Sequence, residues 1–291
     1  MEKKPLVVVN GLVRKDAIAY LKEHVDVRQW TEKTVMPREV LKEWLIDADG
    51  LWCVRPLDVD GDLVKNAPNL KVIAQAAVGY DNVNIDELTA AGIPYGNTPG
   101  VLNETVAELA FTLIATASRR IIENANFVKD GRWAQRPSNI KGFDLSRRTL
   151  GIIGMGAIGV SISRRARAFG MTVVYHNRNQ RLDDKIHKTT YMELDDLLAT
   201  SDVVCVMAPL TDETYHMCDE AFFKKMKNTA LFVNVGRGPI VDTEALINAL
   251  NTGEIDYAAL DVTDPEPLPV DHPLLEVENC LIVPHLSLIH I

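Results

Sequence analysis

Several features are missing from this sequence, and each absence argues against a class of protein. No window of about 18 apolar residues exists, so no membrane-spanning helix is predicted. The early apolar run Leu6–Val9 is too short for the core of a signal peptide. Basic residues are dispersed and the formal net charge is -9, so the field would repel a nucleic-acid backbone. We therefore expect a cytoplasmic protein without a membrane or nucleic-acid partner.

Cysteine is scarce as well. The four cysteines form no CxxC pair, so neither a zinc site nor a disulfide framework is indicated, and we predict no metal site. Cys53, Cys205 and Cys280 lie in apolar runs typical of buried strands. We expect reduced, structural thiols.

What is present is an alternating α/β pattern long enough for two domains. Short β-branched runs alternate with segments of helical period, which predicts parallel sheets covered by helices on both faces. The first series of strands is expected at residues 6–9, 51–54, 72–76 and 93–95. The second is expected at residues 150–153, 172–175, 203–207, 231–235, 258–262 and 281–283. The predicted fold class is α/β, with two doubly wound parallel-sheet domains.

A long apolar helix over residues 101–120 is expected to lead from the first domain to the second. Thr105 and Glu108 have the spacing of a capping box at its start. The loop over residues 131–143 is interpreted either as a solvated excursion or as an oligomer contact.

A dinucleotide-binding motif follows the strand at residues 150–153. The sequence Gly154-Met155-Gly156-Ala157-Ile158-Gly159 has GxGxxG spacing, and a segment of helical period follows it. In this context the glycines permit a tight turn, close approach of the pyrophosphate and packing of helix on strand. The helix N-terminus offers N–H groups to the phosphates.

The end of the next strand bears on the choice of coenzyme. It reads His176-Asn177-Arg178, where enzymes that use NAD present a carboxylate to the ribose hydroxyls. Arg178 can pair with a 2′-phosphate and Asn177 can donate a hydrogen bond to it. We predict that NADP is preferred, and the alternative is a solvated Arg178 with NAD as the coenzyme.

Three chemically capable residues follow later strands. Arg237 follows the run at 231–235, Glu266 follows the run at 258–262, and His285 follows the run at 281–283. Taken singly, they have ordinary explanations as a surface charge, a turn residue and a strand-end histidine. Because the carboxyl ends of parallel strands share one edge, we expect the three side chains to lie together.

At this point the chain resembles the D-isomer-specific 2-hydroxyacid dehydrogenases, the family of glyoxylate and hydroxypyruvate reductases and phosphoglycerate dehydrogenase. The resemblance extends from Leu6 to His285. It is carried by the segment at residues 77–83, the GxGxxG unit, Val235-Gly236-Arg237-Gly238, the Asp-Pro-Glu-Pro segment at residues 264–267 and Pro284-His285.

The resemblance implies a Rossmann coenzyme domain inserted in a flavodoxin-like substrate domain. The expected boundaries are residues 1–98 for the substrate domain, 99–284 for the NAD(P)-binding domain and 285–291 for a remnant of the return to the first domain. It further implies a homodimer. After Pro284-His285 the family continues with small residues and a returning helix, whereas this sequence reads Leu286 to Ile291 and stops. We expect that the native reading frame ends near Leu286 and that the last residues are a truncation or sequencing artefact.

The resemblance also implies roles for single residues. His285 would donate the proton to the keto oxygen, Glu266 would orient it and favour its charged form, and Arg237 would hold the substrate carboxylate. The backbone N–H groups of Val78 and Gly79 would contact the substrate. Independently of the resemblance, Arg55 follows the strand expected at residues 51–54 and could reach the substrate. Beyond the glycine motif and residues 176–178, the predicted coenzyme contacts are Thr105, Ala208, Pro209, Thr214, Val235, Gly236 and Asp261. Asp261 is alternatively a helix cap, residues 208–214 an ordinary strand-to-helix turn, and Arg55 a loop arginine.

The sequence thus predicts an enzyme that reduces a small 2-keto acid, such as glyoxylate or hydroxypyruvate, to the (R)-2-hydroxy acid with NADPH or NADH. The alternative substrate is 3-phosphoglycerate, which is disfavoured because no extra basic cluster for a substrate phosphate is evident. The alternative from another class is a non-catalytic NAD(P)H-binding sensor that resembles the related corepressors. The presence of the arginine, glutamate and histidine together favours the enzyme.

Overall fold

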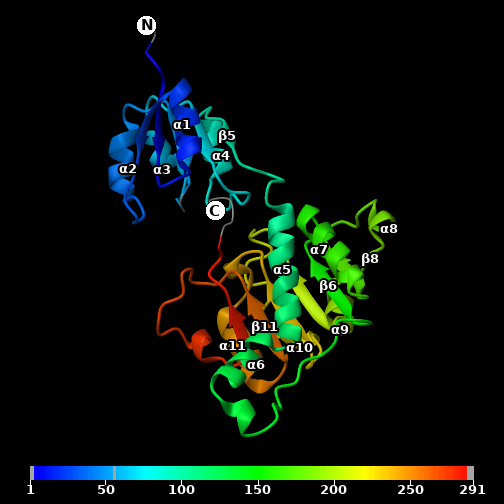
Figure 1. The fold of residues 1–291 in the computed structure, drawn as a ribbon. Coiled ribbons are helices and arrows are strands. Elements are labelled where there is room, and N and C mark those ends of the chain that lie inside the picture. Colours follow the sequence, from blue (N-terminus) through cyan, green and yellow to red (C-terminus); the bar gives the residue numbers. More distant parts are fainter. Residues whose placement is uncertain (1–2, 55–56, 287–291) are drawn as a thin grey trace. The chain divides into compact units, whose positions relative to one another are not determined.

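The computed structural model describes residues 3–54 and 57–286. The chain divides into two compact units, the first ending at Leu102 and the second beginning at Asn103. Figure 1 shows that each unit has a twisted sheet with helices packed against it. The predicted α/β class with two parallel sheets is therefore confirmed.

The first unit is a five-stranded parallel sheet in the order β2-β1-β3-β4-β5. This strand order is that of flavodoxin-like folds, as predicted. Its core includes the buried side chains of Leu41, Leu51 and Ile73. The elements are β1 (Leu6–Val9), α1 (Lys15–His24), β2 (Asp26–Gln29), α2 (Arg38–Leu45), β3 (Gly50–Cys53), α3 (Gly61–Lys65), β4 (Val72–Gln75), α4 (Ile85–Ala90) and β5 (Tyr95–Gly96).

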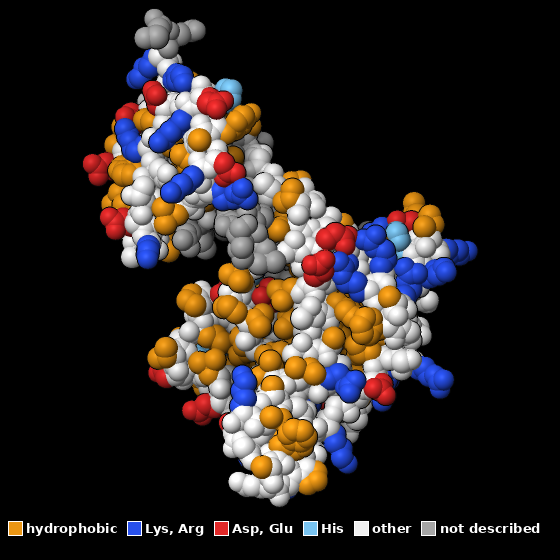
Figure 2. All heavy atoms as spheres, viewed as in Figure 1, with side chains coloured by type: hydrophobic (Ala, Val, Ile, Leu, Met, Phe, Trp, Pro, Cys, Tyr) orange, Lys and Arg blue, Asp and Glu red, His pale blue; other side chains and the backbone are white. Residues whose placement is uncertain are grey.

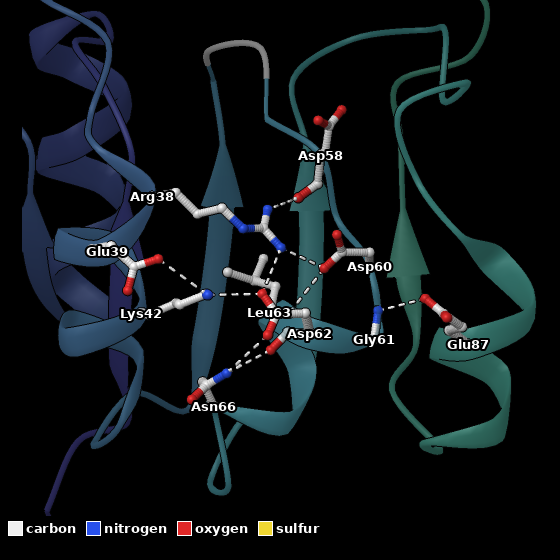
Figure 3. Close-up of polar contacts among 10 residues, drawn as sticks. All are labelled: Arg38, Glu39, Lys42, Asp58, Asp60, Gly61, Asp62, Leu63, Asn66 and Glu87. Atoms are coloured by element: carbon white, nitrogen blue, oxygen red, sulfur yellow. Dashed lines mark hydrogen bonds and ion pairs between the residues drawn. The ribbon is translucent and has the colours of Figure 1, made fainter.

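A network of charged side chains joins α2 to α3 (Figure 3). Arg38 donates to the Asp58 carbonyl at 2.8 Å and to Asp60 Oδ1 at 2.5 Å, while Lys42 lies 2.8 Å from Asp62. Asp60 also caps α3 by accepting from the Leu63 N–H at 2.9 Å. These ion pairs are partly exposed to solvent, so each contributes only about 1 kcal/mol.

The second unit is a seven-stranded parallel sheet in the order β12-β11-β10-β9-β6-β7-β8. The order reverses between β6 and β9, which is the switch point where doubly wound folds bind dinucleotides. The elements are α5 (Asn103–Ser118), α6 (Ile121–Lys129), η1 (Arg132–Ala134), β6 (Thr149–Ile153), α7 (Ala157–Ala168), β7 (Thr172–His176), α8 (Asp184–His187), β8 (Thr190–Tyr191), α9 (Leu194–Thr200), β9 (Val203–Val206), α10 (Glu220–Lys225), β10 (Leu231–Asn234), η2 (Gly238–Ile240), α11 (Thr243–Thr252), β11 (Tyr257–Leu260), η3 (Pro273–Glu276) and β12 (Cys280–Ile282).

The central strands of this sheet are buried on both faces. In β9, Val203 and Cys205 belong to the core formed with α5 and α7, whereas Val204 and Val206 belong to the core formed with α9, α10 and α11. All four residues of β9 are fully buried. This explains why the strand is continuously apolar, since successive side chains point to opposite faces and each face is covered.

Several local predictions were incomplete or wrong. The strands β2 and β8 were missed, because β2 carries the polar sequence Asp-Val-Arg-Gln and β8 has only two residues, both at sheet edges. The expected capping box is wrong, since α5 begins at Asn103 and Thr105 therefore lies inside it. Glu108 instead contacts Arg165 of α7 at 3.3 Å. Arg55 and residues 287–291, with the predicted return to the first domain, lie outside the described residues.

Three of the cysteines are buried and Cys280 is half-buried, and all four are free thiols. Burial raises the pKa of Cys53 and Cys205 to about 12, so neither is a thiolate at neutral pH. Within the described ranges, no helix is long and apolar enough to cross a membrane. No group of three or more His, Cys, Asp or Glu side chains there is placed to bind a metal ion.

Candidate active site

The predicted catalytic residues follow three adjacent strands of the second unit. Arg237 follows β10, Glu266 follows β11 and His285 follows β12. These strands are neighbours in the parallel sheet, so their carboxyl ends lie on one edge. The positive charge of Arg237 opposes the rise in the pKa of His285 and adds to the fall in the pKa of Glu266. The structure thus brings together residues that are separated by up to 48 positions in the sequence.

His285 and Glu266 form a close ion pair. The distance from Nδ1 of His285 to Oε1 of Glu266 is 2.6 Å, and the two side chains are 43% and 41% exposed. The hydrogen bond that His285 donates to Glu266 raises the pKa of His285 above its ordinary value, although burial opposes this effect. Burial works to raise the pKa of Glu266, but the hydrogen bond and charge of His285 outweigh it and the pKa is lowered. Because Glu266 occupies Nδ1, the Nε2 atom remains to hold a proton for another molecule.

The backbone around Arg237 is held by a buried asparagine. Asn234 is 1% exposed; its Oδ1 accepts from the Gly236 N–H at 3.0 Å and its Nδ2 donates to the Arg237 carbonyl at 2.9 Å. A Cβ atom at Gly238 would lie 1.8 Å from the Thr263 carbonyl oxygen, so only glycine allows this approach. The loops after β10 and β11 are therefore packed backbone to backbone, which brings Arg237 near Glu266.

Asp261 lies directly after β11 and is 7% exposed. Burial raises the pKa of its carboxyl group, while the charge of His285 opposes the shift. Its Oδ1 atom has no hydrogen-bond partner among the residues that the structure describes. A buried carboxylate oxygen without a partner is costly, and a donor from a bound molecule would remove that cost. This observation fits the amide group of a nicotinamide.

The glycine loop between β6 and α7 is shaped to receive an anion. Gly154 has φ of 97°, and a Cβ atom there would lie 2.6 Å from the backbone nitrogen of Ala208. A Cβ atom at Gly156 would meet nothing within 4 Å, so the backbone is open to a ligand on that side. Gly159 packs against the Gly154 carbonyl. The first turn of α7 contains no acidic residue. These features fit a dinucleotide pyrophosphate at the helix N-terminus.

The residues after β7 differ in their surroundings. Arg178 is 81% exposed and its Nη1 lies 3.5 Å from Oε2 of Glu213. Asn177 instead faces the glycine loop, where its Oδ1 accepts from the Met155 N–H at 2.6 Å. His176 Nδ1 lies 2.9 Å from the Met192 carbonyl oxygen. Of the three, Arg178 is thus the most exposed to solvent.

The segment after β9 forms an ordered turn beside the glycine loop. Ala208 is buried and approaches Gly154, as described above, while Pro209 is exposed. Thr214 Oγ1 donates to the Pro209 carbonyl at 2.7 Å and accepts from the Thr211 N–H at 2.8 Å. Val235 and Gly236 are buried after β10, and Thr105 is half-buried in α5.

Val78 and Gly79 belong to the first unit and follow β4. Asn97 Nδ2 donates to the Val78 carbonyl at 2.8 Å, and Gln75 Nε2 donates to the Gly79 carbonyl at 2.8 Å. In residues 3–54 and 57–286, no acceptor binds the N–H groups of Val78 and Gly79. The carbonyls are thus engaged and the donors are left for another molecule.

Sequence reasoning did not single out Asn234 or Arg181. Arg181 lies beyond the strand end, and its Nη1 donates to the Met155 carbonyl in the glycine loop at 2.9 Å. The signal for Asn234 was available, because a polar residue in an apolar strand run must find hydrogen bonds when buried. Nothing in the sequence distinguishes Arg181 from Arg178 three residues earlier.

Comparisons with known proteins agree with this site. Residues 111–287 match the family described as D-isomer specific 2-hydroxyacid dehydrogenase, NAD binding domain. The chain is 41% identical over 285 residues to a glyoxylate reductase of Korarchaeum cryptofilum, with 97% of this chain and 86% of the relative covered. A solved structure of a glyoxylate reductase from Paecilomyes thermophila has a TM-score of 0.88 and 31% identity, covering 98% of this chain and 89% of that one.

A second solved structure is a NADPH-dependent glyoxylate/hydroxypyruvate reductase from Sinorhizobium meliloti, in complex with NADP and malonate. Its TM-score is 0.87 at 30% identity, covering 97% of this chain and 86% of that one. The family match covers more than half of the chain, and the relatives align with nearly all of it. This chain therefore belongs to the D-isomer-specific 2-hydroxyacid dehydrogenase family and is an oxidoreductase with an NAD(P)-binding domain.

Proposed function

We propose that this protein reduces a small 2-keto acid, with glyoxylate and hydroxypyruvate as the first candidates, to the (R)-2-hydroxy acid and that it prefers NADPH to NADH. The observation that carries the proposal is the His285–Glu266 pair, 2.6 Å apart, on the sheet edge that also presents Arg237. The relatives named glyoxylate reductase support the substrate class.

The chemistry follows from the charges that develop in the reaction. When bound, the reduced coenzyme supplies the hydride. A keto oxygen that gains negative charge needs a proton donor, and the imidazolium of His285 holds a proton at Nε2. Glu266 at Nδ1 stabilises the imidazolium and fixes the orientation of the ring.

Arg237 is suited to the carboxylate of the substrate. Its planar guanidinium donates two parallel hydrogen bonds to a carboxylate and stays charged at every working pH. The family resemblance also predicts that the N–H groups of Val78 and Gly79 contact the substrate, and within the described residues of the first unit these donors have no acceptor. Asp261 would accept from the nicotinamide amide with its unpartnered Oδ1.

The coenzyme preference is assigned to Arg178. An exposed guanidinium at the end of β7, in place of a carboxylate, favours a 2′-phosphate over a ribose hydroxyl. The relative from Sinorhizobium meliloti is described as NADPH-dependent, which supports this choice.

The test is a spectrophotometric assay of coenzyme oxidation with glyoxylate, hydroxypyruvate, pyruvate and 3-phosphohydroxypyruvate, each with NADPH and with NADH. We expect the highest kcat/KM with glyoxylate or hydroxypyruvate and NADPH. Faster oxidation of NADH would refute the coenzyme preference. A preference for the phosphorylated acid would refute the substrate, and the expected product is identified by chiral chromatography.

We also propose that the protein is a homodimer formed through the surface of α6 and η1. Ile121, Ile122, Val128 and Trp133 are large hydrophobic residues exposed on these elements. Figure 2 shows hydrophobic side chains gathered on the face of the second unit that carries α5 and α6. Exposed apolar patches of this kind mark interaction sites.

Light scattering should give twice the chain mass for the parent protein. The double variant Ile122→Asp with Trp133→Ser should give the mass of the monomer. A monomeric parent protein would refute the proposal.

A further inference from the structure

Side chains from the loop after β7 hold both peptide groups of Met155, the residue between the first two glycines of GxGxxG. The Met155 N–H donates to Asn177 Oδ1 at 2.6 Å. Its carbonyl accepts from Arg181 Nη1 at 2.9 Å and lies 3.4 Å from Asn177 Nδ2. The Met155 side chain is 1% exposed and fits under Gly159. Four separate contacts therefore hold Met155 in place.

Arg181 is itself held in place. Its Nε and Nη2 donate to the two carboxylate oxygens of Asp183 at 2.8 and 2.7 Å, and its backbone N–H donates to Tyr175 Oη at 2.8 Å. Asp183 also lies 3.1 Å from His187 Nε2. The guanidinium is thus engaged with the protein on both of its edges. Arg178, by contrast, has one long contact to Glu213 and is mostly in solvent.

We propose that Asn177 and Arg181 are positioning residues, which hold the glycine loop in the conformation that binds the pyrophosphate of either coenzyme, and that Arg178 alone recognises the 2′-phosphate. The inference rests on the coenzyme site of the proposed function, and it reassigns Asn177 from the 2′-phosphate to the loop. Its test measures coenzyme binding without a keto acid, so it is independent of the substrate assignment.

The physical reason lies in the charge of the loop. A carbonyl oxygen carries partial negative charge, and one that faces the pyrophosphate would repel it. Arg181 draws the Met155 carbonyl toward itself and neutralises it, while Asn177 accepts the N–H of the same residue. Loss of either contact frees the peptide to rotate. The cost falls on pyrophosphate binding, a feature that NADH and NADPH share.

The first experiment compares Arg181→Ala with Arg178→Ala, by titrating NADH and NADPH fluorescence. Arg181→Ala should raise the Kd of both NADH and NADPH about tenfold, which is the effect of losing one charge-assisted hydrogen bond. The ratio of the two Kd values should stay the same within about twofold. Arg178→Ala should raise the Kd of NADPH about tenfold or more and the Kd of NADH less than about twofold. In steady-state kinetics the Arg181→Ala effect should appear in the KM for coenzyme rather than in kcat.

The matched control is Arg148→Ala. Arg148 also pairs with an aspartate, Asp202 at 3.3 Å, but it precedes β6 and so lies at the opposite end of that strand from the glycine loop. This variant should bind both coenzymes as the parent does. Melting temperatures of all variants without coenzyme separate a loss of folding from a loss of affinity.

The second experiment separates the two roles of Asn177. Asn177→Asp keeps an oxygen that accepts from the Met155 N–H but adds a negative charge, which repels a 2′-phosphate. Its affinity for NADH should therefore be retained and its affinity for NADPH lost. Asn177→Leu removes the acceptor and should weaken both coenzymes about tenfold. If Asn177→Leu does not fold, the comparison of Arg181→Ala with Arg178→Ala decides.

Two results would overturn the inference. A loss confined to NADPH in Arg181→Ala would make Arg181 a ligand of the 2′-phosphate. Unchanged affinity for both coenzymes in Arg181→Ala and Asn177→Leu would show that the loop keeps its conformation without these contacts.

Discussion

The two halves of the carboxyl edge of the seven-stranded sheet use charged side chains in different ways. At the ends of β10, β11 and β12, the side chains of Glu266 and His285 contact each other and remain about two-fifths exposed. At the ends of β6 and β7, Asn177 and Arg181 contact the backbone of Met155. In one half the side chains contact each other, whereas in the other they hold a backbone segment in place.

This difference predicts which kinetic constant each half controls. Side chains that meet charge developing in the reaction affect the rate of the chemical step. Side chains that shape a binding loop affect the affinity for the molecule bound there. Substitutions at β10 to β12 should therefore lower kcat or kcat/KM for the keto acid, and substitutions at β6 and β7 should raise the KM for coenzyme.

The largest effect is expected for His285→Ala. General acid catalysis contributes about 10²- to 10⁴-fold, so kcat for keto acid reduction should fall by that factor while the Kd for NADPH changes little. Stopped-flow kinetics and coenzyme fluorescence measure the two quantities. A variant that keeps more than about a tenth of the parent kcat would mean that another group donates the proton.

A smaller loss is expected for Arg237→Lys. Lysine keeps the charge but not the planar fork, so kcat/KM for the keto acid should fall about 100-fold, the effect of removing one aligned donor. A Lys variant as active as the parent would show that charge alone suffices at this position.

Glu266→Gln should change the pH dependence of the reaction. Since the hydrogen bond that His285 donates to Glu266 raises the pKa of His285, the imidazolium should persist to higher pH in the parent, and reduction should slow as pH rises through that raised pKa. Without the carboxylate, the alkaline limb of the kcat/KM profile should move to lower pH, with a loss of about tenfold where only the parent is protonated. Identical profiles would contradict the pairing of these residues.

The same shift has a consequence for stability. A histidine whose pKa is higher in the folded state than in the unfolded state stabilises the fold fully below the unfolded pKa and loses that contribution as pH rises through the folded pKa. As pH rises from the unfolded to the folded pKa of His285, the melting temperature of the parent should therefore fall further than that of Glu266→Gln.

Much of the fold could be predicted from the sequence because buried parallel strands are continuously apolar. The run Val203–Val206 could be predicted as a buried strand because it is continuously apolar, and it is so because helices cover both faces of β9. The edge strand β2 could not be identified in the same way, because three of its four residues are polar. Edge strands gain less from burial, so their sequences carry a weaker signal.

The candidate site shows the same limit. Arg237, Glu266 and His285 could be placed together because each follows an apolar strand and parallel strands end on one edge. The roles of Asn177 and Arg181 depend on which way a side chain turns within a loop, and spacing along the chain does not specify that. Asn177 has the sequence position of a ribose ligand, yet the structure turns its amide to Met155.

The smallest effect is expected for Glu213→Gln, which tests whether Arg178 is the ligand-facing cation of the coenzyme half. Glu213 lies 3.5 Å from Arg178, and both side chains are largely exposed. A carboxylate there competes with a 2′-phosphate for the guanidinium and repels it. Removing the charge should tighten NADPH about two- to threefold and leave NADH unchanged, because exposed charge pairs contribute at most about 1 kcal/mol.

The dependence on salt concentration tests whether the gain in NADPH affinity of Glu213→Gln is electrostatic. Exposed charges are screened within about 10 Å at 0.1 M ionic strength and more closely at higher salt, so the gain in NADPH affinity should shrink toward zero as salt is raised. Glu220→Gln is the control, since Glu220 pairs with Lys224 on the surface of α10 and should leave both affinities unchanged. A gain that persists at 1 M salt, or one shared by NADH, would mean that Glu213 acts on the turn after β9 rather than on Arg178.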